Sequence, residues 1–443
     1  MTKPDSIVAV ETVTNPEDAN PSIIKVTVQG TWTEPVLAWF LSRLVCIVAI
    51  VLGSTLFPIE RRLQLRNEKM PNAGVRVDLP VFFHAYAAGF RDLKRFGAKP
   101  MIFVSVGGSE DWLRPFVHWD AIWWLSIAEV GYVADPQLKA EQNIVFYPLF
   151  PLCIRAVHKL GVPLVLASML VVNGLMLLAT CLLYRLVVRR SGIAAARWTL
   201  AFWLTFPTAF FGVVPYSEAL LAVLSVLAMQ ALLEQKYVTS GLWCGLASAL
   251  KNQGVIIGGA LVLPFLTGPC RGRALLGLFC SGLGLATYMG FLYYQYGDPF
   301  LFVTIQKAWR PNLGNPNPLH WLLGLMQSSL HSIVLLMKSR SLPIELYSGR
   351  ILDPWLGWWM IAWLPAVRRL HWGLVLSSAV MILLPLSTGT VASLGRYVWI
   401  ILPIFVVMGE SLAKSGWRWP IVLVSTSGLL WQAFLYGGGW EVI

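Results

Sequence analysis

Long apolar segments separated by short polar ones run through most of the 443-residue chain. A helix needs about 20 apolar residues to cross a bilayer. On this criterion the pattern predicts an all-α polytopic membrane protein with roughly ten to eleven spans in one transmembrane domain, residues 35–443. The expected spans are 35–58, 164–186, 198–214, 219–233, a hairpin of two shorter helices within 240–268, 274–294, 354–367, 373–387, 398–412 and 420–436.

The longest polar stretches predict a tail and a first loop. Residues 1–34 contain Pro, Asn and Asp and lack the pattern of a cleaved signal, which favours a flexible cytoplasmic tail. Residues 59–163 hold no clean span and are expected to form a long first outer loop, a length that usually indicates function. Two apolar pieces in it, 81–90 and 100–107, are too short to cross and suit interfacial helices.

A second outer loop is expected over residues 295–353. It contains an apolar segment, His320 to Met337, which sidedness predicts to lie on the membrane or dip into it. Basic clusters fix that sidedness, because Lys and Arg collect in short cytoplasmic connections. Arg43, inside the first apolar segment, is expected to reach the interface with its side chain. The clusters used are Arg185, Arg189, Arg190, Arg197, Arg368 and Arg369.

Composition agrees with a membrane protein and excludes several function classes. The chain is 56% hydrophobic and only 13% charged, and its net charge is +12. In a membrane protein this charge indicates basic cytoplasmic loops and anionic lipid, and no basic tract interleaved with aromatics suggests nucleic-acid binding. The six cysteines form no CxxC pair and the histidines are scattered, so neither a disulfide framework nor a zinc site is predicted.

One stretch, His118 to Trp124, combines three tryptophans, a histidine and the carboxylate of Asp120. Aromatic rings beside a carboxylate are typical of a sugar site, where apolar ring faces stack and hydroxyls reach the acid. An interfacial aromatic belt with one solvated Asp has the same composition, since Trp and Tyr collect at headgroup level. The stretch alone does not decide between the two interpretations.

The expected topology places the polar constellations near one face, which favours a single shared site. Asp120 is the candidate general base for an acceptor hydroxyl. Arg396 and Lys251 are candidates for the phosphate of a lipid-linked sugar donor, because that leaving group needs cations. The remaining candidates for substrate contact are His118, Trp119, Trp123, Tyr216, Glu218, Gln306, Trp309 and Tyr397.

Structural roles compete with these assignments. Lys251 can pair with Glu218 or reach the interface, and Glu218 can cap a helix. Asp298, in Gly-Asp-Pro, is expected to begin a turn. His118 can bond a backbone carbonyl without taking part in chemistry, and Gln306 and Trp309 can be interfacial.

Several motifs together resemble one family. They occur in order as Trp119-Asp120-Ala121 and Phe146–Pro151, then Phe206–Phe211 with Tyr216-Ser217-Glu218, then Gly297-Asp298-Pro299 with Gln306 and Trp309, and finally Ser393–Tyr397. This set resembles the integral-membrane mannosyltransferases related to the second mannosyltransferase of glycosylphosphatidylinositol-anchor synthesis (PIG-V-like), with their bacterial members.

The resemblance implies a GT-C fold and an inverting transfer of mannose from a polyprenyl-phosphate carrier on the non-cytoplasmic face. It makes Asp120 the expected base. The chain departs from the family's pattern at His118, where Arg is usual, at Trp124, where Tyr is usual, and around Lys251, where an Arg-containing motif is expected. Lys keeps the charge there but loses the bidentate fork.

The resulting hypothesis is a membrane mannosyltransferase whose partners are the bilayer, a polyprenyl-phosphate sugar and a lipid or glycan acceptor. No cofactor is expected, and a divalent metal stays open. A transporter or flippase of a lipid-linked sugar, or a GT-C enzyme for another prenyl-phosphate sugar, are the alternatives; a transporter often shows two related halves, which the sequence lacks. Compact size and short loops favour a bacterial inner membrane over the endoplasmic reticulum.

Overall fold

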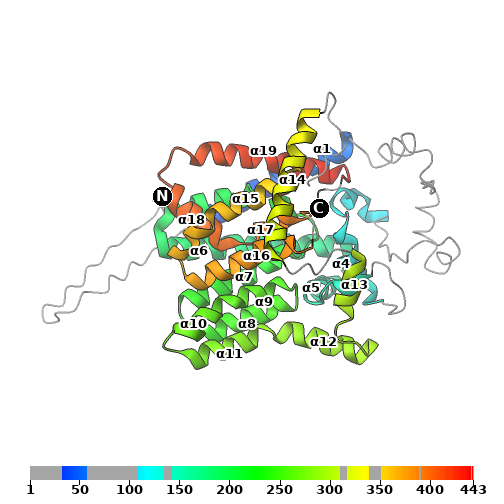
Figure 1. Cartoon of the computed structure of the whole chain (residues 1–443). Helices are drawn as coiled ribbons and strands as arrows, with labels where there is room; N and C mark the ends of the chain where they lie inside the picture. The colour runs from blue at the N-terminus through cyan, green and yellow to red at the C-terminus, as the bar shows by residue number, and fades with distance from the viewer. Residues whose placement is uncertain are drawn as a thin grey trace, which may run out of the picture.

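The computed structural model describes residues 32–56, 108–133, 142–309, 317–338, 351–388, 391–440 and 442, and these are predominantly helical (Figure 1). Within those ranges no strand occurs, as the apolar pattern predicts. The residues expected to form most of the N-terminal tail and the interfacial helices 81–90 and 100–107 lie outside the described ranges, as do parts of both expected outer loops.

The first half of the chain forms the body around the longest helix. In order, its helices are α1 (Thr33–Leu56), the 3-10 helix η2 (Gly108–Phe116), α4 (Asp120–Val130), η3 (Asn143–Val145), α5 (Leu149–His158), α6 (Leu164–Leu204), η4 (Ala209–Gly212), α7 (Glu218–Leu233), α8 (Tyr237–Ser248), α9 (Gln253–Gly258), η5 (Gly259–Leu261) and α10 (Val262–Thr267).

The second half packs against this body, and its last helix, α19, returns to pair with α1 (Figure 1). Its helices are α11 (Arg271–Ser281), α12 (Leu283–Tyr296), α13 (Leu301–Trp309), α14 (Pro318–Lys338), α15 (Asp353–Trp363), η8 (Leu364–Arg369), α16 (Trp372–Leu386), α17 (Leu394–Trp399), α18 (Leu402–Leu412) and α19 (Arg418–Gly437).

Four helical segments are long and apolar enough to cross a membrane: Thr33–Leu56, Leu164–Leu204, Arg271–Tyr296 and Arg418–Gly437. The chain is therefore an all-α membrane protein. The other apolar helices are shorter, partly because Pro and Gly interrupt the runs. In the 240–268 segment, for example, Gly258 and Gly259 divide α9 from η5, and in η8 Pro365 follows the end of α15.

The region of α6, where two spans are expected, holds two helices joined across a kink. They meet at Gly192, whose φ of 85° and ψ of 172° are not helical. The second of them ends at Leu204 and not at Val214. Pro207 and Pro215 lack the backbone N–H that a continuing helix needs, so residues 205–217 form an irregular segment around η4.

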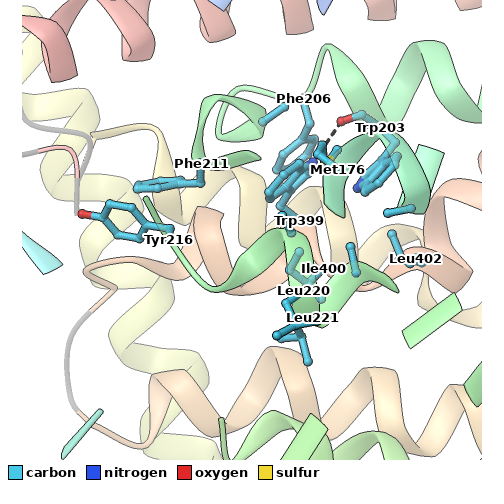
Figure 2. Packing of buried hydrophobic residues seen from close by; sticks show 14 of the residues in the cluster. Met176, Trp203, Phe206, Phe211, Tyr216, Leu220, Leu221, Trp399, Ile400 and Leu402 are labelled. Atoms are coloured by element: carbon cyan, nitrogen blue, oxygen red, sulfur yellow. Dashed lines mark hydrogen bonds between the residues drawn. The ribbon is translucent and has the colours of Figure 1, made fainter. Parts of the chain in front are cut away.

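A continuous aromatic core underlies this irregular segment. Trp399 of α17 stacks on Trp203 of α6 with ring centroids 5.8 Å apart, and its Nε1 donates to the Trp203 carbonyl at 2.9 Å. Figure 2 shows this pair beside Met176 and Phe206, with Phe211 and Tyr216 further along the same segment. The core thus extends to the side chains that line the site described below.

Arg43 does not reach the interface as expected. The residue is 3% exposed, and its guanidinium donates to the carbonyl of Gly212 and to Ser42. The reason is the close packing of α1 between α6 and α19, where a Cβ on Gly53 would lie 1.8 Å from the Phe434 carbonyl oxygen. Small residues permit such close contact between membrane helices. The Arg43 side chain is buried there and holds the η4 segment through its hydrogen bond to the Gly212 carbonyl.

Candidate functional site

Four charged side chains from distant parts of the chain meet in one cluster. Asp120 is the first residue of α4 and Glu218 the first of α7, whereas Lys251 lies in the turn between α8 and α9 and Arg396 in α17. Arg396 Nη1 donates to Asp120 Oδ2 at 2.6 Å, and its Nε lies 3.4 Å from Glu218 Oε1. Lys251 Nζ pairs with the same Glu218 oxygen. Below, these four residues are called the charged cluster.

The cluster is largely shielded from solvent and its formal charges cancel. The side chains of Glu218 and Arg396 are 1% and 6% exposed, and those of Lys251 and Asp120 are 15% and 19% exposed. Burial alone would lower the pKa of Arg396, but the nearby charges of Asp120 and Glu218 outweigh it and raise that pKa well above its ordinary value. Arg396 is therefore a permanent cation with its most accessible partner at Asp120.

Aromatic rings surround the guanidinium of Arg396. Its Cζ lies 5.5 Å from the ring centroid of Phe211 and 5.3 Å from those of Tyr216 and Tyr397. Lys251 Nζ lies 5.6 Å from the Tyr397 ring. Ring faces attract a cation without neutralising it, so both cations are held in place while retaining charge for an anionic ligand.

The backbone before Asp120 is held in an unusual conformation. Trp119 has φ 55° and ψ −125°, which costs energy for a residue with a side chain. The carbonyl of His118 accepts hydrogen bonds from the hydroxyls of Tyr216 at 3.2 Å and Tyr436 at 3.3 Å, and Trp119 Nε1 donates to the Trp440 carbonyl. The irregular segment and the C-terminal helix together fix where α4 starts, and hence where the Asp120 carboxylate lies.

The two interpretations of Lys251 and Glu218 turn out to be compatible. Glu218 begins α7, where a negative charge is favourable, and is also the ion-pair partner of Lys251. Because Oε1 of Glu218 contacts both cations, this carboxylate sets the spacing between Lys251 and Arg396. Its role in the geometry is that of a bridge between the two cations.

The predicted aromatic and loop candidates are placed unequally. Trp123 is 6% exposed and stacks on Phe146 with centroids 6.0 Å apart, a position that favours packing over an open sugar-stacking face. Trp119 is partly exposed and adjoins Asp120. His118 contacts the cluster's surroundings through its backbone, and its ring meets that of Tyr436 edge-on at 5.2 Å.

The candidates on the second outer loop lie on a neighbouring element. Gln306 and Trp309 belong to α13, which packs against η3; the side chain of Trp309 is outside the described residues. Asp298 accepts from the N–H of Phe300 at 2.8 Å, as expected of a turn. None of the contacts described for residues 298–306 joins them directly to the charged cluster.

Three residues with structural ties to the cluster were not predicted from the sequence. Phe211 lies beneath Arg396, Tyr436 bonds the backbone at His118, and the carboxylate of Asp353 lies against the start of α17. Phe211 stood within a recognised motif, which was a usable signal. Tyr436 and Asp353 have no such signal in the sequence, because no motif near either residue indicates its contact partner.

Among the residues that the structure describes, no group of three or more His, Cys, Asp or Glu side chains is placed to hold a metal ion. The two carboxylates of the charged cluster are each paired with a cation. What the cluster offers chemically is one carboxylate at the edge of the site and two fixed cations behind it.

The comparisons with known proteins point the same way as this geometry. The family model described as mannosyltransferase (PIG-V) matches residues 95–298, a little less than half of the chain. Asp120, Glu218 and Lys251 fall inside the match and Arg396 falls outside it. The searches of curated proteins and of solved structures each returned no match. Over residues 95–298 the chain is similar to the mannosyltransferase (PIG-V) family, and this match supports a membrane glycosyltransferase.

Proposed function

We propose that the chain transfers mannose, with inversion, from a polyprenyl-phosphate carrier to an acceptor hydroxyl on the non-cytoplasmic face of the membrane, in a GT-C architecture. The observation that carries the proposal is the pairing of Asp120 with Arg396 at 2.6 Å inside a charged cluster built from four elements. It joins a candidate base and a candidate phosphate ligand in one contact.

Asp120 is suited to the role of base because it is the carboxylate of the cluster with the greatest exposure. In the proposed reaction the acceptor oxygen attacks the anomeric carbon as its proton passes to Asp120. The bond from that carbon to the phosphate oxygen breaks, and its electron pair stays on the leaving phosphate. General-base assistance is typically worth about 10²–10⁴-fold in rate.

The charge balance of the cluster suits this step. The donor is a phosphodiester with one negative charge, and the leaving phosphate monoester carries close to two at neutral pH. When Asp120 accepts the proton, the cluster passes from formal neutrality to one positive charge. Arg396 can then exchange its contact with Asp120 for one with the leaving phosphate, so that the new negative charge meets a free guanidinium.

Lys251 and Glu218 support the same exchange. Glu218 is buried and contacts both cations through one oxygen, which keeps them near each other when Asp120 loses its charge. Lys251 supplies a second positive charge to the phosphate as a point charge, without the fork of an Arg. Trp119 and Tyr397 are partly exposed rings and are the candidate stacking surfaces for a sugar bound at Asp120. Tyr216 is fully buried and acts through its contacts with Arg396 and the His118 carbonyl. Gln306, Trp309 and His118 are candidates for further contacts.

The deciding experiment supplies purified protein in lipid nanodiscs with polyprenyl-phosphate mannose and a lipid extract as acceptor, and follows hexose addition by mass spectrometry. We expect a product one hexose heavier, and a loss of at least about 10²-fold in rate for Asp120→Asn. Glu234→Asn, which removes an exposed carboxylate paired with Lys236, is the matched control and should leave the rate unchanged.

Near-normal transfer by Asp120→Asn would overturn the assignment of the base. Movement of the intact donor across the bilayer without any product would favour a transporter or flippase instead. Transfer from a different prenyl-phosphate sugar, with mannose inactive, would keep the mechanism and change the donor. We expect bacterial inner membrane as the site of action, with endoplasmic reticulum as the alternative, and deletion followed by glycolipid profiling would identify the acceptor.

A further inference from the structure

We infer that Asp353 is a positioning residue for the transfer reaction: its buried carboxylate holds the first turn of α17 so that Arg396 faces Asp120. This inference rests on the proposed function for its kinetic consequences, but its structural content does not. Asp353 lies outside the family match and in none of the recognised motifs.

The carboxylate has no access to solvent and is directed at backbone. Asp353 is 1% exposed, at the first position of α15. Burial raises the pKa of Asp353 to about 8, and the backbone N–H groups of Gly395, Leu394 and Ser393, which face the carboxyl group, act against that shift. These are the groups that a helix leaves unsatisfied at its start, so Asp353 caps α17 from another helix.

The start of α17 needs such support. Ser393 has φ 66°, in the left-handed region that residues with a side chain rarely occupy. Such backbone persists where the surroundings determine it strongly. The helix that follows is only six residues long and carries Arg396 at its third position, so a change in its first turn is passed directly to the guanidinium.

Gly395 shows how tight this contact is. A Cβ added there would lie 2.6 Å from Asp353 Oδ1 and 2.9 Å from Thr208 Cγ2. Thr208 Oγ1 donates to the Gly395 carbonyl at 2.9 Å. The first turn of α17 is therefore held by Asp353 at its N–H groups and by Thr208 at the Gly395 carbonyl. A side chain at position 395 would push both residues away from the turn.

The inference separates the acceptor role of Asp353 from its charge. Oδ2 of Asp353 has no hydrogen-bond partner in the described part of the chain. An Asn at this position keeps a carbonyl oxygen that faces the first turn of α17 and replaces Oδ2, which bonds nothing there. Asp353→Asn should therefore retain the position of Arg396, whereas Asp353→Ala should not.

The test measures donor KM and kcat for Asp353→Ala, Asp353→Asn and Gly395→Ala in nanodiscs, beside hydrogen exchange of the peptide covering residues 393–399. For Asp353→Ala and Gly395→Ala we expect faster exchange there and a fall in kcat/KM of about 10²-fold, as misplacing a group by about 1 Å can cause. Asp353→Asn should stay within about threefold of the unchanged protein in kcat/KM.

Ser332→Ala is the structural control, because it removes the hydroxyl that accepts a hydrogen bond from Trp355 Nε1 and so joins α14 to α15, and it leaves Asp353 in place. It should lower stability without changing exchange at residues 393–399 or donor KM. Equal losses for Asn and Ala at position 353 would assign a direct role to the charge and overturn the inference, as would unchanged exchange in Asp353→Ala. If the unchanged protein transfers nothing from the donor, the proposed function fails, and the exchange measurements still decide the positioning role.

Discussion

Two ion-paired regions of the molecule differ in the burial of their arginine side chains. In the charged cluster, Arg396 and Glu218 are at most 6% exposed. Between α6 and α18, Arg190 pairs with Glu410 at 3.1 Å with side chains 34% and 16% exposed, beside an open cavity of about 620 Å³. The Arg396–Asp120 pair of the cluster and the Arg190–Glu410 pair each join residues more than 200 positions apart. Sequence separation therefore does not distinguish the two pairs, whereas the exposure of the arginine side chain does, at 6% for Arg396 and 34% for Arg190.

The difference in exposure sets how much stability is lost when one partner of a pair is removed. An exposed pair is replaced by water and ions at little cost, with a typical worth of about 0–1 kcal/mol. A buried pair that loses one partner leaves an uncompensated charge, at a cost of about 3–5 kcal/mol. In the charged cluster, Arg396 would therefore favour a new anion when its contact with Asp120 is lost. The more exposed Arg190–Glu410 pair is suited to joining α6 and α18.

The largest effect is expected from Arg396→Ala. It leaves Asp120 and Glu218 with only Lys251, so the free energy of unfolding should fall by about 3–5 kcal/mol and transfer should become undetectable. Thermal unfolding in nanodiscs and the transfer assay measure both. Arg396→Lys restores the charge without the fork, and should recover stability more than activity. Full activity in Arg396→Ala would show that the buried cluster is structural only.

The sequence predicts the members of the charged cluster better than it predicts their contacts. A charge within an apolar segment is costly, so charged residues within or beside such segments stand out as candidates. The structure brings four of them together, Asp120, Glu218, Lys251 and Arg396. The sequence predicts their pairing only partly, because Lys251 was expected either to pair with Glu218 or to reach the membrane interface. The contact of Arg396 with Asp120 depends on the course of α17, which no local pattern encodes.

The fold shows a similar limit. Apolar run length correctly predicted the start of α6 at Leu164 and its all-helical surroundings, but not its end at Leu204 or the irregular segment around η4. Arg43 was misread because its acceptor, the Gly212 carbonyl, lies 169 residues away. Composition likewise does not distinguish a ring that faces a sugar from one that stacks on a neighbouring ring, as Trp123 does on Phe146.

A smaller effect is expected when the exposed pair is broken. Glu410→Gln removes the carboxylate that accepts from Arg190 and Ser191, and should lower the free energy of unfolding by less than about 1 kcal/mol, with transfer unchanged. The difference should shrink further in 0.5 M salt, because screening acts on exposed pairs. Unfolding curves at two salt concentrations check this. A loss comparable to that of Arg396→Ala would abolish the distinction drawn between the two regions.

The smallest effect concerns His371, which lies near the same exposed pair in the chain segment that follows Arg369. Its Nδ1 accepts from the N–H of Gly373 at 3.0 Å, an N-cap for α16 that needs the neutral ring. Burial lowers the pKa of His371 below its ordinary value. The folded state therefore binds fewer protons than the unfolded state, in which the pKa is about 6.5, and stability is full above that pH and falls as pH drops toward the folded pKa.

Lowering the pH from 7.5 to 5.5 should accordingly remove about 1 kcal/mol or less through this residue. His371→Asn, which caps a helix without titrating, should remove that part of the pH dependence while Arg396→Lys retains it. Measuring the free energy of unfolding of both variants across this pH range isolates the contribution of His371 to its pH dependence. A pH dependence unchanged by His371→Asn would place the titrating group elsewhere, and the exposed region would then contribute nothing to the acid sensitivity of the fold.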